Sequence, residues 1–242
     1  MTYRPRNITD QIVDELGSSI ATGKRPAGGA LPTEQQLIEE FGASRTVLRE
    51  AMKVLSAKGL VTTRPRRGTI IEPETEWNLA DPDILNWMLK RKNVLPLMLE
   101  FIDVRLAIEP AAAALAARHG SLEAYDRIEA ALARMKDATL GDDDPIQSDI
   151  AFHAEILKAS DNRFFWSLRH MIEVALKFSI RITNKRKGVE RASYDDHKRI
   201  YDAICARDAG QAEQLMRDML LEAKALLSEE VTRLDSMQET MA

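Results

Sequence analysis

The sequence predicts a mainly α-helical protein with two domains: an N-terminal winged helix-turn-helix with a small β-hairpin wing, and a C-terminal antiparallel all-helical bundle. Three helical patterns and one β-rich hairpin follow one another up to Pro73, and the patterns after it are helical. The 242 residues suffice for two hydrophobic cores. We expect one domain over residues 1–73, a linker with a first helix over 74–90, and a helical domain over 91–235.

Three helices are predicted to open the chain. Residues 7–22 carry an apolar residue at every fourth position, which gives one apolar helical stripe. Thr33 and Gln36 have the spacing of a capping box at the start of a second helix. Ser44 caps a third helix, which Gly59 ends.

A β-hairpin is predicted next. The runs LVTTRP and GTIIEP are rich in β-branched residues and flank the basic segment 64–68. Helix, helix, turn, helix and hairpin, in this order, is the arrangement of a winged helix-turn-helix, whose recognition helix enters the major groove of DNA.

The rest of the chain shows helical patterns separated by short breaks. Asp81 has the position of an N-cap, with Pro82 as the first helical residue. Consecutive helices with short connections form an antiparallel bundle. The predicted helices cover residues 94–119, 121–138, 145–159, 162–183, 191–207 and 208–231.

Composition excludes several classes of protein. Hydrophobic residues make up 45% and charged residues 30%, as in a well-folded soluble protein. A lone cysteine, Cys205, rules out an internal disulfide and fits a reducing compartment. No apolar run approaches the roughly 20 residues that a membrane span needs, and the N-terminus has no apolar signal core. We therefore expect a cytoplasmic protein without a membrane partner.

Charge is distributed unevenly along the chain. Residues 1–72 hold 11 Lys and Arg against 8 Asp and Glu, whereas residues 73–242 hold 23 against 30. This asymmetry favours a polyanion such as DNA as the partner of the first part. A DNA-architectural protein is not expected, because its basic charge would extend throughout the chain.

Candidate DNA contacts lie at the start of the third helix and at the tip of the hairpin. Short polar and cationic side chains at these places reach base edges and phosphates. The alternative is a solvated basic helix face, and the helix caps, apolar stripe and basic hairpin together favour DNA. The candidates are Ser44, Arg45, Thr46 and Arg49 in the helix and Arg66, Arg67 and Gly68 in the hairpin.

A candidate metal site lies in the second part. Asp149 and His153 are four residues apart, so their side chains share one helical face, and His197 belongs to a later helix. A carboxylate and two imidazoles facing into a helical bundle suit a divalent metal. The alternative is a surface ion pair or a core histidine, which is also how we interpret His119 and His170.

The segment from Leu31 to Ile71 resembles the DNA-binding domain of the GntR family of bacterial regulators, through LPTEQQLIEEFGASRTVLREAMKVLSAKGLVTTRPRRGTII. The resemblance implies operator binding. Gln35 departs from the family pattern, which has an arginine that touches DNA there, so the operator sequence is expected to differ. Because one recognition helix reads only a few base pairs, we expect a homodimer on a palindromic operator.

The second part is similar to the effector-binding domain of the FadR-type GntR subfamily, through Arg105-x3-Glu109, Asp149-x3-His153 and Asp196-His197. That resemblance implies a divalent metal of the zinc, nickel or manganese class, held by Asp149, His153 and His197. The family's remaining histidine position is occupied by Met219. Methionine is a poor ligand for hard cations, so either water or the effector would complete the coordination, or the metal is bound weakly or is absent.

The segment 76–87, EWNLADPDILNW, resembles regulators of sugar-acid catabolism, galactonate repressors in particular. It implies a small carboxylate effector, whose pocket needs cations and amides, and repression that the effector releases. Arg105 could instead pair with Glu109, Asn162 could be only a helix cap, and Trp77 and Trp87 could serve only as anchors. The candidate effector contacts are Arg105, Asn162, Arg181 and Asn184.

The alternative function is a small metal-dependent hydrolase that uses Asp149, His153 and His197. Such an enzyme needs a general base beside an open metal position, and no acidic residue is placed by its spacing to serve. A hydrolase also gains nothing from a recognition helix. We therefore expect a transcription regulator and not an enzyme.

Overall fold

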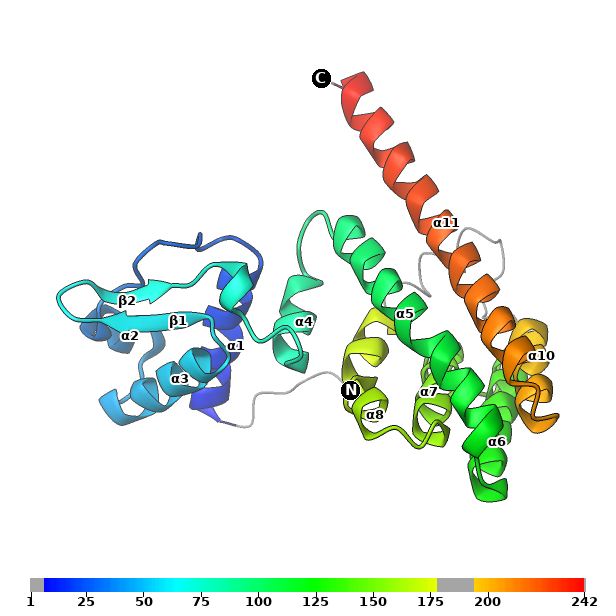
Figure 1. Cartoon of the computed structure of the whole chain (residues 1–242). Coiled ribbons are helices and arrows are strands. Elements are labelled where there is room, and N and C mark those ends of the chain that lie inside the picture. Colours follow the sequence, from blue (N-terminus) through cyan, green and yellow to red (C-terminus); the bar gives the residue numbers. More distant parts are fainter. Residues whose placement is uncertain (1–6, 178–193, 242) are drawn as a thin grey trace. The chain divides into compact units, whose positions relative to one another are not determined.

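The computed structural model describes residues 7–177 and 194–241, and the chain divides into two compact units, Met1–Val94 and Leu95–Ala242. Both units are mainly helical, and the first also carries a two-stranded sheet (Figure 1). Among the described residues, every helix is too short or too polar to cross a membrane. The predicted fold class is confirmed.

The first unit has the predicted order of elements. Its helices and strands are α1 (Ile8–Ala21), α2 (Glu34–Phe41), α3 (Arg45–Ala57), β1 (Val61–Arg64), β2 (Gly68–Ile71), the 3-10 turn η1 (Glu74–Glu76) and α4 (Pro82–Met88).

Local sequence signals explain where the helices of the first unit begin and end. The Thr33 side chain accepts from the Gln36 backbone while the Gln36 side chain accepts from the Thr33 backbone, which completes the capping box of α2. Gly42 then ends α2 in the left-handed region, at φ 58°. Ser44 caps α3 and Asp81 caps α4. These predicted caps are confirmed.

The sheet is an antiparallel hairpin, with Val61 opposite Ile71 and Arg64 opposite Gly68. A loop before α2 adds to it, because the Leu31 amide donates to the Thr69 carbonyl at 2.8 Å. Strand β1 also contacts α3, so the hairpin and α3 belong to one packed unit.

Helix α4 packs against α1 inside the first unit. The Trp87 ring lies over Gly17, and its Nε1 donates to Asp14 Oδ1 at 2.6 Å. Lys58 Nζ, at the end of α3, lies 2.7 Å from Asp81 Oδ2. The segment predicted to link the domains is therefore part of the first compact unit.

The second unit is a helical bundle. Its longest helices are adjacent, and α11 runs alongside α5 in the opposite direction (Figure 1). Alanines of α5, including Ala112, Ala113, Ala116 and Ala117, are fully buried in its core. The labelled helices are α5 (Leu95–His119), α6 (Leu122–Leu140), α7 (Pro145–Ala159), α8 (Arg163–Ser167), α10 (Tyr194–Cys205) and α11 (Ala209–Met241).

Two predicted helices differ from the structure. The helix expected over 162–183 is interrupted, because α8 ends at Ser167, Leu168 is its C-cap, and helical backbone resumes from residue 169 to 177. The last helix continues ten residues beyond the predicted end, to Met241. Its sequence beyond residue 231 has no helix-stop signal such as Gly or Pro, which is why the helix continues.

Candidate functional site

The start of α3 presents its polar side chains to solvent. The Ser44 hydroxyl is used as the helix cap and accepts from the Val47 amide at 3.3 Å. Arg45 and Arg49 lie one turn apart, with side chains 65% and 62% exposed, and Thr46 is exposed as well. Cationic side chains exposed in the first turns of a recognition helix can reach base edges and phosphates.

Glu34, the first residue of α2, connects both arginines. Its Oε1 lies 2.9 Å from Arg45 Nε and 3.5 Å from Arg49 Nε. The neighbouring Gln35 is exposed and donates to Glu39 Oε1 at 2.8 Å. Sequence reasoning did not find this role of Glu34, because the contact depends on how α2 packs beside α3.

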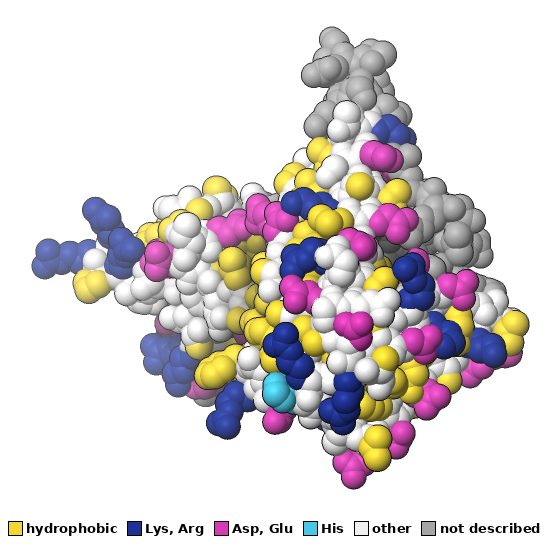
Figure 2. Space-filling view, turned by 45° about the vertical axis from the view of Figure 1, so that its right-hand side comes forward, with side chains coloured by type: hydrophobic (Ala, Val, Ile, Leu, Met, Phe, Trp, Pro, Cys, Tyr) yellow, Lys and Arg dark blue, Asp and Glu magenta, His cyan; other side chains and the backbone are white. Residues whose placement is uncertain are grey.

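The wing carries a basic tip. Arg66 and Arg67 are exposed, and the turn places Arg66 at φ 65° and Gly68 at φ 74°. A Cβ added to Gly68 would meet nothing within 4 Å, so its backbone is open to close approach. Figure 2 shows Lys and Arg side chains gathered at the end of the first unit that carries this hairpin.

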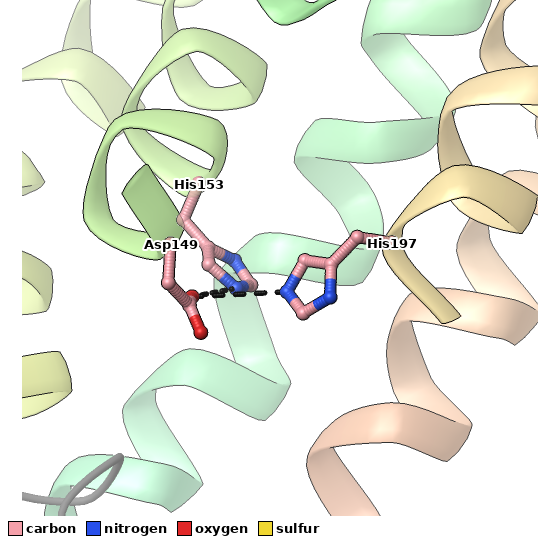
Figure 3. A group of neighbouring side chains, drawn as sticks. All are labelled: Asp149, His153 and His197. Atoms are coloured by element: carbon pink, nitrogen blue, oxygen red, sulfur yellow. Dashed lines mark ion pairs between the residues drawn. The ribbon is translucent and has the colours of Figure 1, made fainter. Parts of the chain in front are cut away.

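A buried polar cluster lies inside the second unit. Asp149 and His153 come from α7 and His197 comes from α10, and each side chain is almost fully buried (Figure 3). Asp149 Oδ1 lies 3.2 Å from His153 Nε2 and 3.7 Å from His197 Nε2. The structure therefore brings together the three residues that the sequence singled out.

Two further charged residues from α5 complete this cluster. Glu109 Oε2 lies 2.6 Å from His153 Nδ1, whereas Asp149 faces the other ring nitrogen, Nε2. Arg105 holds the same carboxylate with two nitrogens, at 2.5 and 3.2 Å. The sequence showed Arg105 and Glu109 one helical turn apart, but it did not show that Glu109 touches a histidine.

The electrostatics keep both carboxyl groups ionised. Burial by itself would raise the pKa of Glu109, but Arg105 and His153 outweigh it and lower this pKa to about 2. Burial is likewise outweighed at Asp149, where His153 and His197 hold the pKa below its usual range. Burial would lower the pKa of His153, but the carboxylates of Glu109 and Asp149 raise it.

The geometry of the cluster fits a divalent cation. The candidate ligand atoms lie within 4.8 Å of one another. Zinc bonds of about 2.0–2.2 Å in a tetrahedron separate two ligand atoms by about 3.3 Å, close to the two distances from Asp149 Oδ1. Within the described part of the chain, Asp149 Oδ1 is buried yet accepts no hydrogen bond of good geometry, which leaves it available to a cation.

Two family profiles match the chain. The profile of the bacterial regulatory proteins of the gntR family matches residues 8–71, and the profile of the FCD domain matches residues 100–222. The chain belongs to the GntR family. The region matched by the FCD profile includes the buried cluster, and the region matched by the gntR profile includes α3 and the wing.

The relatives of this GntR-family chain are transcription regulators. It is 31% identical to the galactonate operon transcriptional repressor of Escherichia coli strain K12, over 92% of this chain and 98% of that protein. It is 32% identical to the HTH-type transcriptional regulator LutR of Bacillus subtilis strain 168, over 86% and 96%. This GntR-family protein is therefore a DNA-binding transcription regulator and not an enzyme, and the hydrolase alternative is rejected.

Solved structures share the fold of the regulator. Lar, described as controlling the expression of the Listeria monocytogenes agr system, aligns with a TM-score of 0.62 at 17% identity, over 94% of this chain and 99% of that one. Streptococcus agalactiae GntR aligns with a TM-score of 0.50 at 24% identity, over 90% and 99%. At these identities the likeness concerns the fold alone.

The structure locates two of the four candidate effector contacts of the regulator. Arg105 was expected either to bind the effector or to pair with Glu109. In the structure it pairs with Glu109. The Asn162 side chain caps α8 by accepting from the amides of residues 164 and 165, as the alternative for this residue stated. Arg181 and Asn184 lie outside the described residues.

The position of the expected further histidine is on α11. Met219 is half-buried there and packs against the core of the bundle. Together with Asp196 and Arg199 it lines a pocket of about 170 Å³ between α10 and α11. The thioether replaces an imidazole on a helix that packs against α10, the helix of His197.

Proposed function

We propose that this regulator represses an operon for sugar-acid catabolism and that a small carboxylate effector releases the repression. The observation that carries the proposal is the buried group of Asp149, His153 and His197 in the FCD domain. The similarity to a relative named as a galactonate operon repressor supports a sugar acid as the effector.

A divalent ion of the zinc, nickel or manganese class is proposed to be held by Asp149, His153 and His197. Such an ion supplies a positive charge to which the carboxylate of an effector can bind. Met219 adds no hard ligand, which leaves coordination positions for water or for the effector. Arg181 and Asn184 are proposed as further effector contacts, because guanidinium and amide groups bind carboxylates and hydroxyls.

DNA binding is proposed to use the exposed face of α3 and the wing. A homodimer would place two such faces on a palindromic operator, which supplies the specificity that one helix lacks. Oligomeric state is measured by sedimentation; a monomer that still protects a symmetric site would contradict this arrangement. The proposed contacts are Gln35, Ser44, Arg45, Thr46, Arg49, Arg66, Arg67 and Gly68.

A titration of operator DNA tests the effector proposal. The protein is loaded with Zn²⁺, bound to its fluorescently labelled operator, and titrated with a panel of sugar acids and with the corresponding neutral sugars. We expect one or more acids to release the operator and the neutral sugars to have no effect.

A matched pair of variants identifies the site. His153→Asn removes a proposed ligand, and His170→Asn makes the same change at a half-exposed histidine that pairs with Glu173. We expect His153→Asn to hold the operator without responding to the acid, and His170→Asn to respond as wild type does. An equal response of both variants would refute the site, and an operator that no acid releases would refute the effector class.

A further inference from the structure

His153 is contacted at both ring nitrogens. Its Nε2 faces Asp149 Oδ1 at 3.2 Å, and its Nδ1 faces Glu109 Oε2 at 2.6 Å. The His197 imidazole lies on the Asp149 side, with its Nε2 3.7 Å from the same carboxylate oxygen. The two nitrogens of His153 therefore have different surroundings: Nε2 belongs to the group of candidate ligand atoms, and Nδ1 faces a carboxylate outside that group.

Glu109 is itself fixed in place. Its side chain is 1% exposed, and the Arg105 guanidinium holds both of its oxygens. Arg105 is 5% exposed at its side chain and comes from the preceding turn of α5. A carboxylate held in this way has little freedom to turn away from the ring of His153.

We propose that Glu109 is a positioning residue of the metal site, and that Arg105 acts through it rather than on the effector. The carboxylate of Glu109 lies 2.6 Å from His153 Nδ1, which makes no hydrogen bond of good geometry within the described residues. With an ion on Nε2, Glu109 would accept the Nδ1–H, which would fix the ring and leave the Nε2 lone pair directed at the ion. This inference rests on the proposed function, because it requires that an ion binds.

An ion pair with only a structural role would give a different arrangement. A structural pair of Arg105 and Glu109 would be complete with its two hydrogen bonds, and it would need no third partner. Here Glu109 Oε2, which accepts the longer bond from Arg105, also lies 2.6 Å from His153 Nδ1. Arg105 therefore contacts Glu109, and Glu109 lies beside His153 Nδ1. Arg105 Nη2 also lies 3.5 Å from His153 Nε2, which is one of the candidate ligand atoms.

Zinc affinity tests the proposal in the full chain. Glu109→Gln alone would leave the Arg105 charge buried without a partner and could prevent folding, so the main variant is Arg105→Met combined with Glu109→Gln. Glu155→Gln is the matched control, because Glu155 lies on α7 near His153 in sequence but pairs with Arg127 at 2.9 Å. Calorimetry with Zn²⁺ alone should show about 10–100-fold weaker binding for the double variant and wild-type binding for the control.

Nitrogen NMR of the histidine rings separates positioning from general damage. The chain has four histidines, so a zinc-loaded sample labelled with ¹⁵N-histidine gives few signals, and His153→Asn assigns the signal of interest. In wild type and in Glu155→Gln we expect His153 to be protonated at Nδ1 and coordinated through Nε2. In the double variant we expect this state to be lost or mixed with the other tautomer.

The outcomes distinguish this inference from the proposal on which it rests. If wild type binds no zinc, both are overturned. If wild type binds zinc and the double variant binds it equally well, only the positioning role is overturned. A double variant that binds weakly but keeps the wild-type tautomer of His153 also overturns it, because the loss then comes from packing.

Discussion

Replacing Gly17 with alanine should loosen α4 from the rest of the DNA-binding unit. A Cβ at this position would lie 2.4 Å from Cη2 and Cζ3 of Trp87. Carbon atoms pack best at about 3.5–4.0 Å, so the ring must retreat by about 1 Å or more. The ring is 3% exposed, and its Nε1 is bound to Asp14 at 2.6 Å, which leaves it little room to move.

Three contributions determine how much Gly17→Ala changes the free energy of unfolding. Overpacking a dense core costs about 1–3 kcal/mol. Weakening the bond from Trp87 to the Asp14 carboxylate adds about 1 kcal/mol or more, because hydrogen bonds to charged groups contribute about 1.5–3 kcal/mol. Alanine is favoured over glycine inside a helix by about 0.5–1 kcal/mol, which opposes the other two. The free energy of unfolding of this unit should fall by about 1–4 kcal/mol.

Urea unfolding of the full chain, followed by tryptophan fluorescence and circular dichroism, measures this loss. The matched experiment repeats Gly17→Ala in a Trp87→Leu background, where the smaller side chain leaves space for the new methyl group. We expect Gly17→Ala to lower the free energy of unfolding much less in the Trp87→Leu background than in wild type. The effects of the two substitutions are then strongly non-additive. An equal cost in both backgrounds would show that the contact with Trp87 is not the cause.

Three further predictions concern the same unit. Arg49→Ala should weaken operator binding by about 1–3 kcal/mol and relax discrimination at one base pair, as measured by anisotropy on operator and mutated operator; unchanged discrimination would mean that α3 enters the groove differently. Arg67→Ala should weaken binding to all DNA sequences alike and reduce the slope of log K against log salt by about one, and a sequence-dependent loss would contradict a phosphate contact. Lys58→Met should lower the free energy of unfolding by about 1–3 kcal/mol, because Asp81 loses a partner at 2.7 Å whose side chain is 12% exposed; an unchanged urea midpoint would show that this ion pair does not stabilise the unit.

The elements of the first unit could be predicted from the sequence because their signals are local. A capping box such as that of Thr33 and Gln36 involves residues within one turn, and a glycine in the left-handed region at Gly42 ends a helix whatever surrounds it. The grouping of Asp149 with His153 is also local, since a spacing of four residues fixes one face. These predictions needed no knowledge of tertiary packing.

Tertiary contacts could not be predicted in the same way. The Glu34 carboxylate reaches Arg45 and Arg49 only because α2 packs beside α3, and no spacing within one helix shows this. Glu109 was visible as a partner of Arg105, but its contact with His153 depends on how α5 packs against α7. The sequence does not show that the Glu109 carboxylate has a further contact besides Arg105.

The packing of α4 constrains how an effector signal could reach the DNA-binding face. Helix α4 is bound to α1 and α3 through Trp87 and Lys58, and Arg91 just beyond it donates to the Ala21 carbonyl at 2.8 Å. Allosteric coupling energies are typically about 1–3 kcal/mol, whereas separating α4 from this unit would break several partly buried polar contacts at about 1–3 kcal/mol each. We therefore do not expect an effector to act by detaching α4. The covalent connection that remains to carry a change of orientation is the short segment between Arg91 and Leu95.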